Sequence, residues 1–467
     1  MAGGRNTKSS GPVPPSRTLV LDNGASTIKA GFVSDDHTDE PRVIPNCIAR
    51  DRARKVYVAS DLEKCHDFGE VQFRRPVEKG YIVNWEAQKE IWDHEFFDDK
   101  APQKCDPSET RLLLAEQPNS LPILQANCDQ VIFEEYQFAS YYRGIGMWLS
   151  LLHVSSTQLT FVFPGASFNA YHDIQGILQT PRDPNSVPQI PAEAVLLIDS
   201  GYSNTIVMPL LNGKPLHSAV RRLDVGGKLM TNYLTRLLSL RYYDMRNDTY
   251  IVNEIKEQAS YVSLDFNGDL EKTWKGTRGE KREPYVTGAG IAKDYILPDF
   301  HTKTKGVVRD YDPAMHTKAR KMAARAADND EDILTLRNER FSVPELLFQP
   351  SDIGLRQPGL ADVIMQSLSE LPIGLWPGLL ANIVVVGGNA LFAGFIQRLE
   401  KELVKRVPDA CIVRVAHPVD PITSTWHGGA ELAKHSDIHK LSATKQEYEE
   451  YGGAWVARKF GSGNTGV

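Results

Sequence analysis

The chain has 467 residues, of which 41% are hydrophobic, 24% are charged and 9% are aromatic, and its formal net charge is −6. This composition is typical of a globular protein with two or more domains and a large buried core. Its mild acidity gives no global argument for a protein that coats nucleic acid or a membrane surface.

The five cysteines are scattered along the chain, and no two of them form a C-x-x-C pair. They favour a reducing compartment and support neither a disulfide framework nor a zinc site. The N-terminus lacks the apolar core of a signal peptide, and no later apolar run is long enough to span a bilayer. We therefore expect a cytoplasmic or nuclear protein without a membrane partner.

The first predicted element is a β-hairpin over Thr18–Phe32, which follows a Gly-, Ser- and Pro-rich tail at residues 1–17. Such a tail cannot bury enough apolar surface to order itself. Two apolar runs flank Asn23-Gly24, a strong signal for a hairpin turn. Asp22 stands where the first strand ends, which makes this turn a candidate functional site.

The rest of the first half reads as strands followed by helices. Pro41–Tyr57 is rich in strand formers, and Arg111–Ala115 is predicted to be a further strand. Asn84 can cap a helix whose two tryptophans are expected to pack in the core. The segment Val131–Leu152 is predicted to be one long helix.

The hairpin pattern recurs at Ala194–Pro209, where an apolar strand ends in Asp199, followed by Ser200 and Gly201. The two hairpins suggest two related halves. Residues 153–193, which separate them, are rich in Pro, Asn and Ser towards their end and are predicted to be an inserted loop. The insertion is either tolerated decoration or a docking arm.

The second half continues with a predicted strand at Ala219–Leu223, a helix from Val225 to Leu240 and another over Tyr250–Leu264. Residues 267–332 are then strongly basic. One interpretation is a solvated loop with a charged helix. The other is a contact with DNA phosphates or an acidic protein face, without base recognition because aromatic residues are not interleaved.

A third informative turn lies within Asn382–Gly394, where a buried strand runs directly into Gly387-Gly388 and a helix follows. Glycines at such a junction allow a ligand to approach the backbone and leave helix N–H groups facing it. Alone, the pair is more often a requirement of packing or of the turn.

Together, the three turns fit one ligand, a nucleotide with a divalent metal. Such a ligand needs backbone N–H groups and small hydroxyls around its phosphates and one or two carboxylates at the hydrated metal. Asp22 and Asp199 supply the carboxylates, and Lys29 is a candidate phosphate cation. The alternative is two ordinary Asp-containing hairpin turns. No G-x-x-x-x-G-K-[ST] sequence is present, so this is not a P-loop protein.

The sequence resembles actin and the actin-related proteins from Thr18 to about Phe460. LDNGASTIKAGF and IDSGYSNTIVMP are similar to the two phosphate motifs of that family, and VVVGGNALFAGF is similar to its adenosine motif. RLDVGGKLMTNYL, NERFSVPELLFQPSDIG and the ending TKQEYEEYGGAWVARKF agree as well. DSGYS, FEEYQF and IPNC are most similar to the nuclear class that serves in chromatin remodelling.

The resemblance implies an α/β protein with the actin-like ATPase fold, shared with sugar kinases and heat-shock ATPases, in two related halves and four subdomains. Residues 18–152 would form the first half, completed by 405–460. Residues 194–404 would form the second half, with the basic insertion at about 267–332, and 461–467 would be a flexible tail.

The implied cofactor is ATP or ADP with Mg²⁺, with Asp22 and Asp199 on the side of the metal. The residues expected to contact the nucleotide are Asp22, Gly24, Ala25, Ser26, Lys29, Asp199, Gly201, Tyr202, Ser203, Asn204, Gly227, Lys256, Glu257, Gly387, Gly388, Asn389 and Phe392.

Several positions depart from the family pattern. The glutamine that positions the attacking water in actin falls at Gly146, and a nearby histidine falls at Ile206; neither residue can orient or deprotonate water. Tyr202 replaces an acidic residue of the second phosphate loop. The stretch between Ile44 and Pro76 lacks a recognisable polymerisation loop, so no self-polymerisation is expected.

By this resemblance, and because of these departures, we expect a nucleotide-binding, largely non-catalytic subunit of the nuclear complex that deposits the histone variant H2A.Z. Its expected partners are the motor ATPase of that complex, a small zinc-finger subunit and the nucleosome, with DNA contact through the basic insertion. Some of the protein would be cytoplasmic. The alternatives are an active ATPase of the actin and sugar-kinase type and a cytoskeletal actin-related protein.

Overall fold

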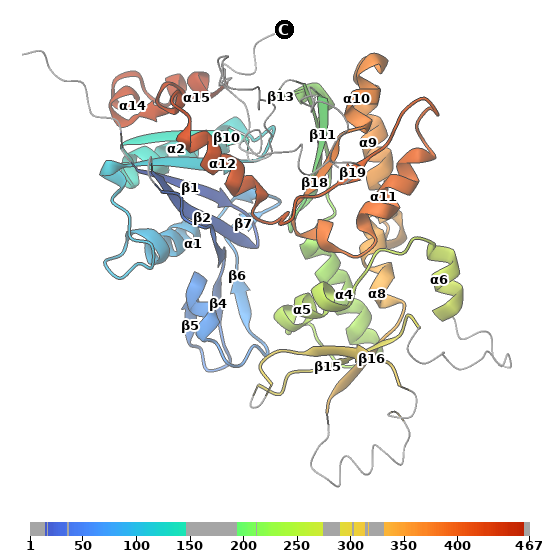
Figure 1. Cartoon of the computed structure of the whole chain (residues 1–467). Coiled ribbons are helices and arrows are strands. Elements are labelled where there is room, and N and C mark those ends of the chain that lie inside the picture. Colours follow the sequence, from blue (N-terminus) through green and yellow to red (C-terminus); the bar gives the residue numbers. More distant parts are fainter. Residues whose placement is uncertain are drawn as a thin grey trace, which may run out of the picture.

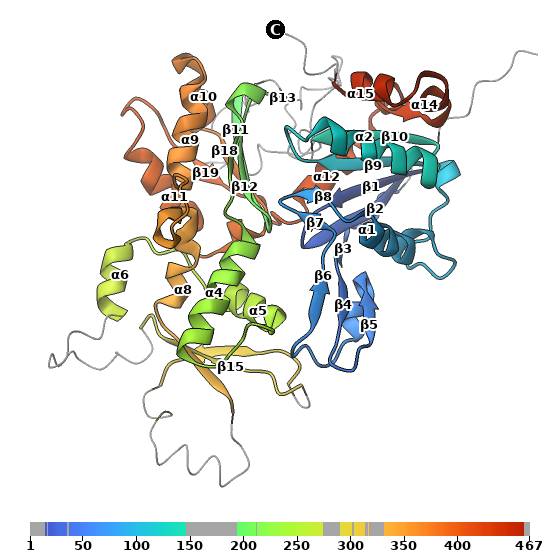
Figure 2. The same ribbon diagram turned by 180° about the vertical axis from the view of Figure 1, so that it is seen from behind.

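The computed structural model describes residues 15, 17–34, 37–145, 194–211, 213–273, 290–300, 303–312, 316 and 331–461. The predictions for the 153–193 insertion, Gly146, the 462–467 end and much of the 1–17 tail and the basic segment lie outside these residues. Figure 1 shows two halves side by side, each with a large sheet and a smaller lobe beneath it, and Figure 2 shows them from behind. Within the described residues, no helix combines the length and apolar character needed to cross a membrane.

The first half is built on a six-stranded sheet with the order β20-β10-β9-β1-β2-β3. Its strands are β1 (Arg17–Asn23), β2 (Thr27–Ser34), β3 (Arg42–Pro45), β9 (Thr110–Glu116), β10 (Ser140–Ile145) and β20 (Ala443–Thr444). The predicted first hairpin is confirmed, with Asp22 opposite Lys29. Strand β1 runs parallel to β9, so the ends of both strands reach the same edge of the sheet.

Helices cover both faces of this sheet, and several of them come from the end of the chain. They are α1 (Trp85–Trp92), α2 (Pro122–Gln130), α12 (Ser424–Lys434), α13 (Ile438–Leu441), α14 (Lys445–Tyr451) and α15 (Gly453–Gly461). Asn84 caps α1 as predicted, because its side chain accepts a hydrogen bond from the Ala87 N–H. Trp85 and Trp92 meet edge to face, with ring centroids 5.9 Å apart, and Trp92 is buried.

The prediction of one long helix over Val131–Leu152 is wrong beyond its first turn, because only Val131–Glu135 is helical among the described residues of this segment. Helical turns end soon after Glu135, and Gln137 has a left-handed φ of 60° that breaks the helix. The chain then forms β10, which pairs in parallel with β9 and at one end with β20. Pairing on both edges and the burial of Tyr141 and Tyr142 favour a strand there, so tertiary contacts override the helical pattern.

The second half repeats the hairpin in a sheet with the order β13-β12-β11-β18-β19, and β14 also pairs with β12. Its strands are β11 (Ala194–Ser200), β12 (Thr205–Leu211), β13 (Lys214–Pro215), β14 (Arg221–Leu223), β18 (Ile383–Val386) and β19 (Val415–Ala416). Asp199 lies opposite Ile206, as Asp22 lies opposite Lys29 in the first hairpin. The two aspartates therefore hold equivalent places, but one faces an apolar residue and the other a lysine.

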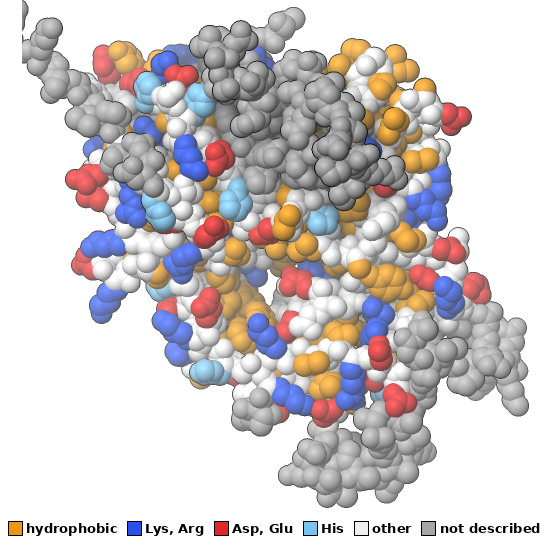
Figure 3. Space-filling model, in the orientation of Figure 1, with side chains coloured by type: hydrophobic (Ala, Val, Ile, Leu, Met, Phe, Trp, Pro, Cys, Tyr) orange, Lys and Arg blue, Asp and Glu red, His pale blue; other side chains and the backbone are white. Residues whose placement is uncertain are grey.

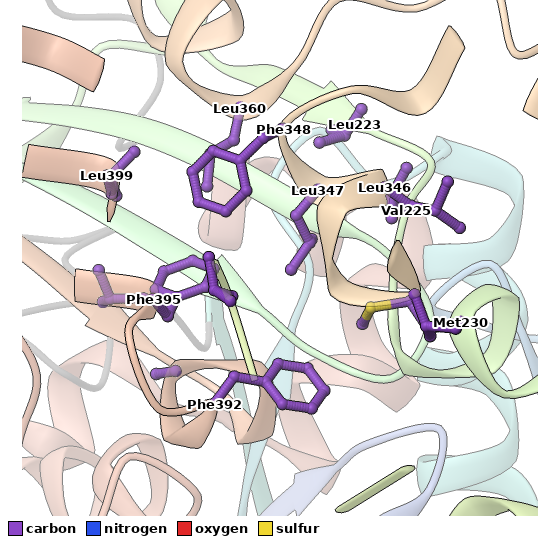
Figure 4. Close-up of a cluster of buried hydrophobic side chains, with 14 of the residues drawn as sticks. Leu223, Val225, Met230, Leu346, Leu347, Phe348, Leu360, Phe392, Phe395 and Leu399 are labelled. Carbon is purple, nitrogen blue, oxygen red and sulfur yellow. The ribbon is translucent and has the colours of Figure 1, made fainter. Parts of the chain in front are cut away.

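The second half also contains helices, several of which pack on its sheet and enclose the larger core. They are α4 (Gly227–Arg241), α5 (Thr249–Ala259), α6 (Phe266–Thr273), α8 (Glu339–Ser342), α9 (Leu360–Ser369), α10 (Trp376–Leu380) and α11 (Phe395–Val404). The predicted helix over Tyr250–Leu264 thus stops at Ala259, and the predicted strand at Ala219–Leu223 begins only at Arg221. Figure 4 shows part of the core between these elements, in which Phe348, Phe392 and Phe395 lie among buried leucines, Val225 and Met230.

Two smaller sheets form the lower lobes in Figure 1. They comprise β4 (Ile48–Arg50), β5 (Val56–Val58) and β6 (Gln72–Arg74) on one side, and β15 (Lys293–Ile296), β16 (Val307–Asp310) and β17 (Ile333–Leu336) on the other. The short pair β7 (Val77–Glu78) and β8 (Tyr81–Ile82) lies between β6 and α1 in the chain.

The two halves contact each other both between the lower lobes and closer to the large sheets. The rings of Phe68 and Tyr250 stack with centroids 4.0 Å apart, and the Glu70 N–H donates to Asp248 at 3.0 Å. Closer to the large sheets, Lys228 pairs with Glu78 at 2.6 Å. These contacts join the first half of the protein to the second half.

Candidate functional site

One cavity of about 510 Å³ lies between the two halves, and every residue predicted to contact the nucleotide lines it. The turns of both hairpins and the diglycine turn meet there because β1 runs parallel to β9 and β11 runs parallel to β18. Parallel strands bring their carboxyl ends to one edge, which is where ligands bind in such sheets. The structure therefore brings the predicted residues together, and their binding role stays a prediction.

The first turn is held from behind by α1 and by the segment after β3. The side-chain amide of Asn46 donates to the Gly24 carbonyl at 2.8 Å. Asn23 is fixed from two sides, since it donates to Gln88 at 2.9 Å and accepts from the Trp92 indole at 3.2 Å. These bonds fix the turn before any ligand is present, which lowers the entropic cost of binding.

The second turn rests on the N-terminus of α4. The Lys228 N–H donates to the Tyr202 carbonyl at 2.8 Å, and the Gly227 N–H donates to the Gly201 carbonyl at 3.0 Å. A Cβ at Gly226 would lie 2.6 Å from the Asn204 nitrogen, so only glycine permits this approach. The first N–H groups of the helix thus hold the turn, and the turn presents its own backbone to the cavity.

The diglycine turn serves both packing and the cavity. Gly387 has a φ of +89°, and a Cβ on it would lie 2.4 Å from the Ser200 carbonyl oxygen. The Asn389 side chain donates to Ser200 Oγ at 3.1 Å and to the Gly201 carbonyl at 2.8 Å. This turn therefore braces the second hairpin, as the packing interpretation predicts, and also lines the cavity.

Asp199 lies near a second carboxylate in the cavity, Asp22, and the lysine beside them pairs with Asp22. Lys29 pairs with Asp22 at 3.1 Å. Burial, with a further contribution from the Asp22 carboxylate, raises the pKa of Asp199 to about 7, although Lys29 opposes the shift. A half-buried, poorly solvated carboxylate beside a second one favours a proton or a cation between them.

Lys256 and Glu257 line the cavity from α5. Lys256 is buried and donates to Thr231 at 3.0 Å and to Asn253 at 2.8 Å. Burial lowers the pKa of Lys256 to about 8; Glu257 opposes this shift, and Arg75 adds to it. The lysine is therefore anchored between α4 and α5 while its surroundings favour a nearby anion.

A family model described as Actin matches residues 13–461 of the chain. The chain belongs to the actin family. It is 66% identical to Actin-related protein 6 of Neurospora crassa over 462 residues, covering 99% of this chain and 98% of that protein. It is 45% identical to Actin-like protein arp6 of Aspergillus fumigatus, covering 96% and 95%, and 34% identical to Actin-related protein 6 of Arabidopsis thaliana, covering 95% and 99%.

Membership of the actin family confirms the predicted actin-like ATPase fold, and the mixed α/β sheets described above agree with it. The predicted resemblance to the actin-related proteins is confirmed by the same matches. All five cysteines lie among the described residues, and each is a free thiol.

Mg²⁺ fits the carboxylates of this actin-family cavity. Among the described residues, no group of three or more His, Cys, Asp or Glu side chains could hold a metal by itself. Mg²⁺ commonly uses one or two carboxylates and takes its other ligands from water and phosphate. Asp22 and Asp199 would hold the ion in that way, and its charge would offset the desolvation and the repulsion from Asp22 that raise the Asp199 pKa.

Ile206, which occupies the position of the histidine expected from the family resemblance, is a buried residue. Ile206 is 3% exposed and does not line the cavity. Gly146, the other departure, lies outside the described residues. Within the described chain, the expected place of a water-activating histidine is thus apolar.

A buried charged cluster that was not predicted lies on the first-half side of the cavity. Arg143 lies 3.1 Å from Asp129 and 3.5 Å from Glu116, and both Arg143 and Asp129 are almost fully buried. Burial raises the pKa of Asp129 to about 7 against the opposing charge of Arg143. Glu116 is the last residue of β9, which runs parallel to β1. Like Asp22, it is a carboxylate at the end of a buried strand, and this position in the sequence could have marked it as a residue near the cavity.

Proposed function

We propose that this actin-related protein binds ATP or ADP with Mg²⁺ without appreciable turnover, as a subunit of the nuclear chromatin-remodelling complex that deposits the histone variant H2A.Z. The observation that carries the nucleotide part is the meeting of the two aspartate-bearing turns and the diglycine turn around one cavity. The assignment to remodelling rests on the sequence resemblance and on the relatives named Actin-related protein 6.

The chain's own residues would hold the ligand rather than transform it. Backbone groups of Gly24 to Ser26 and of Gly201 to Asn204 would surround the phosphates, and the bound metal would supply positive charge between the two halves. Because ligand binds only the folded state, it would stabilise the closed arrangement by mass action. A fixed relation between the halves is what a motor ATPase and a zinc-finger subunit would recognise.

Contact with the nucleosome through residues 267–332 is part of the proposal. The described cations of this segment are partly neutralised: Lys303 and Arg309 both pair with Glu331, at 2.6 and 3.0 Å, and Lys293 pairs with Asp310. Figure 3 shows acidic and basic side chains interspersed over the described part of one face. A DNA contact would therefore use other cations of the segment and would weaken steeply with salt.

Phosphate release by the purified protein tests the non-catalytic part. We expect release from Mg-ATP that does not exceed that of Asp199→Asn, because Ile206 offers no base. Turnover well above that of the variant would show an ATPase and overturn this part.

Purification of the tagged chain from nuclear extract tests the assignment to a complex. We expect a motor ATPase, a zinc-finger subunit and histones to accompany it in stable stoichiometry. Recovery of the chain alone, or Mg-ATP-dependent polymers in sedimentation, would instead favour a cytoskeletal role.

A further inference from the structure

The side chain of Arg75 reaches both hairpin turns that line the cavity. Arg75 lies between β6 and β7, in the first half. Its Nη1 donates to the Ser26 carbonyl at 3.2 Å and lies 3.5 Å from the Ala25 carbonyl, both in the first turn. Its guanidinium carbon also lies 5.1 Å from the ring centroid of Tyr202, in the second turn.

Tyr202 is held firmly on its own side. Its backbone carbonyl accepts the Lys228 N–H, and its ring lies against Gly227, where an added Cβ would be 3.1 Å from the ring carbon Cδ2. The Lys256 ammonium lies 6.0 Å from the centroid of the same ring. The aromatic ring thus lies within cation–π range of a cation from each half, and the Tyr202 backbone is tied to the start of α4.

We propose that Arg75 and Tyr202 form a clasp between the two turns that line the cavity, and that this clasp retains the phosphate-bearing ligand by slowing its dissociation. This inference rests on the proposed nucleotide site and adds the residues that control exchange there. Opening the halves far enough to release a ligand would break the contact between the guanidinium and the aromatic ring. That contact lies directly on the two turns predicted to surround the phosphates.

The other contacts between the halves provide a comparison. Neither Glu78 nor Arg75 lines the cavity, but Arg75 contacts both turns, whereas Glu78 pairs with Lys228 through exposed side chains. The stack of Phe68 on Tyr250 is likewise formed by residues outside the cavity lining. If the halves were merely held together, loss of either contact would matter as much as loss of the clasp.

The test measures dissociation of a fluorescent ADP, in the presence of Mg²⁺, from the full chain after addition of excess ATP. We expect Arg75→Ala and Tyr202→Leu each to dissociate about 3- to 30-fold faster, the range that a partly buried cation–π contact provides. Tyr202→Phe keeps the ring and is expected to restore slow dissociation. Glu78→Gln, the matched control, removes an ion pair between the halves and is expected to match the parent rate.

The double variant Arg75→Ala/Tyr202→Leu should dissociate no faster than the faster single variant, because both remove one contact. Rates in Arg75→Ala and Tyr202→Leu equal to the parent rate, or an equal acceleration by Glu78→Gln, would overturn the clasp. If the parent protein binds no fluorescent ADP, the proposed nucleotide function itself fails. If Tyr202→Leu does not fold, the dissociation rates of Arg75→Ala and Tyr202→Phe still test the clasp.

Discussion

Replacing Asp199 with asparagine is expected to raise the melting temperature of the nucleotide-free protein at pH 8 and to weaken its response to Mg-ATP. Without ligand, Asp199 is a half-buried carboxylate beside Asp22, and desolvation together with the Asp22 charge raises its pKa, so the ionised form is unfavourable in the folded protein. A neutral side chain of the same shape removes that cost, by about 1–3 kcal/mol. The same change removes a predicted ligand of Mg²⁺, so Mg-ATP should stabilise the variant less than the parent.

The pH dependence of this effect has a definite sign. The pKa of Asp199 is about 7 in the folded state, above its ordinary value of about 3.9 when unfolded. Between these values the folded protein holds a proton that the unfolded chain has lost, so stability falls as pH rises from about 4 to about 7. Above pH 7 the contribution is constant. Asp199→Asn lacks this contribution, so its advantage over the parent should grow with pH over that interval.

Melting curves of parent and variant at pH 5, 6, 7 and 8, with and without Mg-ATP, check both statements. Comparing the two proteins cancels the contribution of other groups with raised pKa values, such as Asp129. Two results would contradict this account of Asp199. One is a variant with a lower melting temperature than the parent at pH 8 without nucleotide. The other is a variant whose melting temperature rises as much on addition of Mg-ATP as that of the parent.

Replacing Trp426 with alanine is expected to have the largest effect on the stability of the first half. Trp426 comes from α12, near the end of the chain, yet it is fully buried and its indole donates to the Val20 carbonyl at 3.0 Å. It packs so closely on β2 that a Cβ at Gly31 would lie 2.6 Å from its ring. Loss of the ring should cost about 3–5 kcal/mol.

Urea unfolding with hydrogen exchange at β1 and β2 measures this cost. Trp426→Phe keeps most of the packing and loses the hydrogen bond, so it should cost less, about 1–2 kcal/mol. Val419→Ala, at a fully exposed side chain, is the control and should stay within about 0.5 kcal/mol of the parent. Equal effects of the alanine and phenylalanine variants would mean that the ring does not join the end of the chain to the first sheet.

Local patterns were sufficient to predict the elements that carry the candidate site. Asn23-Gly24 between two apolar runs indicates a hairpin without knowledge of the rest of the chain, and the same holds for the strand that ends in Asp199. The residues predicted from the family motifs all line the same cavity. Their convergence follows from the parallel pairing of β1 with β9 and of β11 with β18, which a local pattern does not specify.

The features that were missed depend on contacts between distant segments. Strand β10 has an apolar pattern compatible with a helix, and only its pairing with β9 and β20 decides its form. Arg75 stands beside another arginine in a short loop and gives no sequence signal of its contact with Tyr202. The charged cluster around Arg143 likewise combines residues from β9, α2 and β10.

The nucleotide content of the purified protein tests the central claim most directly. The protein would be purified without added nucleotide and denatured, and the released small molecules would be separated and quantified against protein. The two facing turns and the clasp predict close to one ATP or ADP for each chain, and less in Arg75→Ala. No nucleotide in the parent, together with a melting temperature unchanged by added Mg-ATP, would contradict the account.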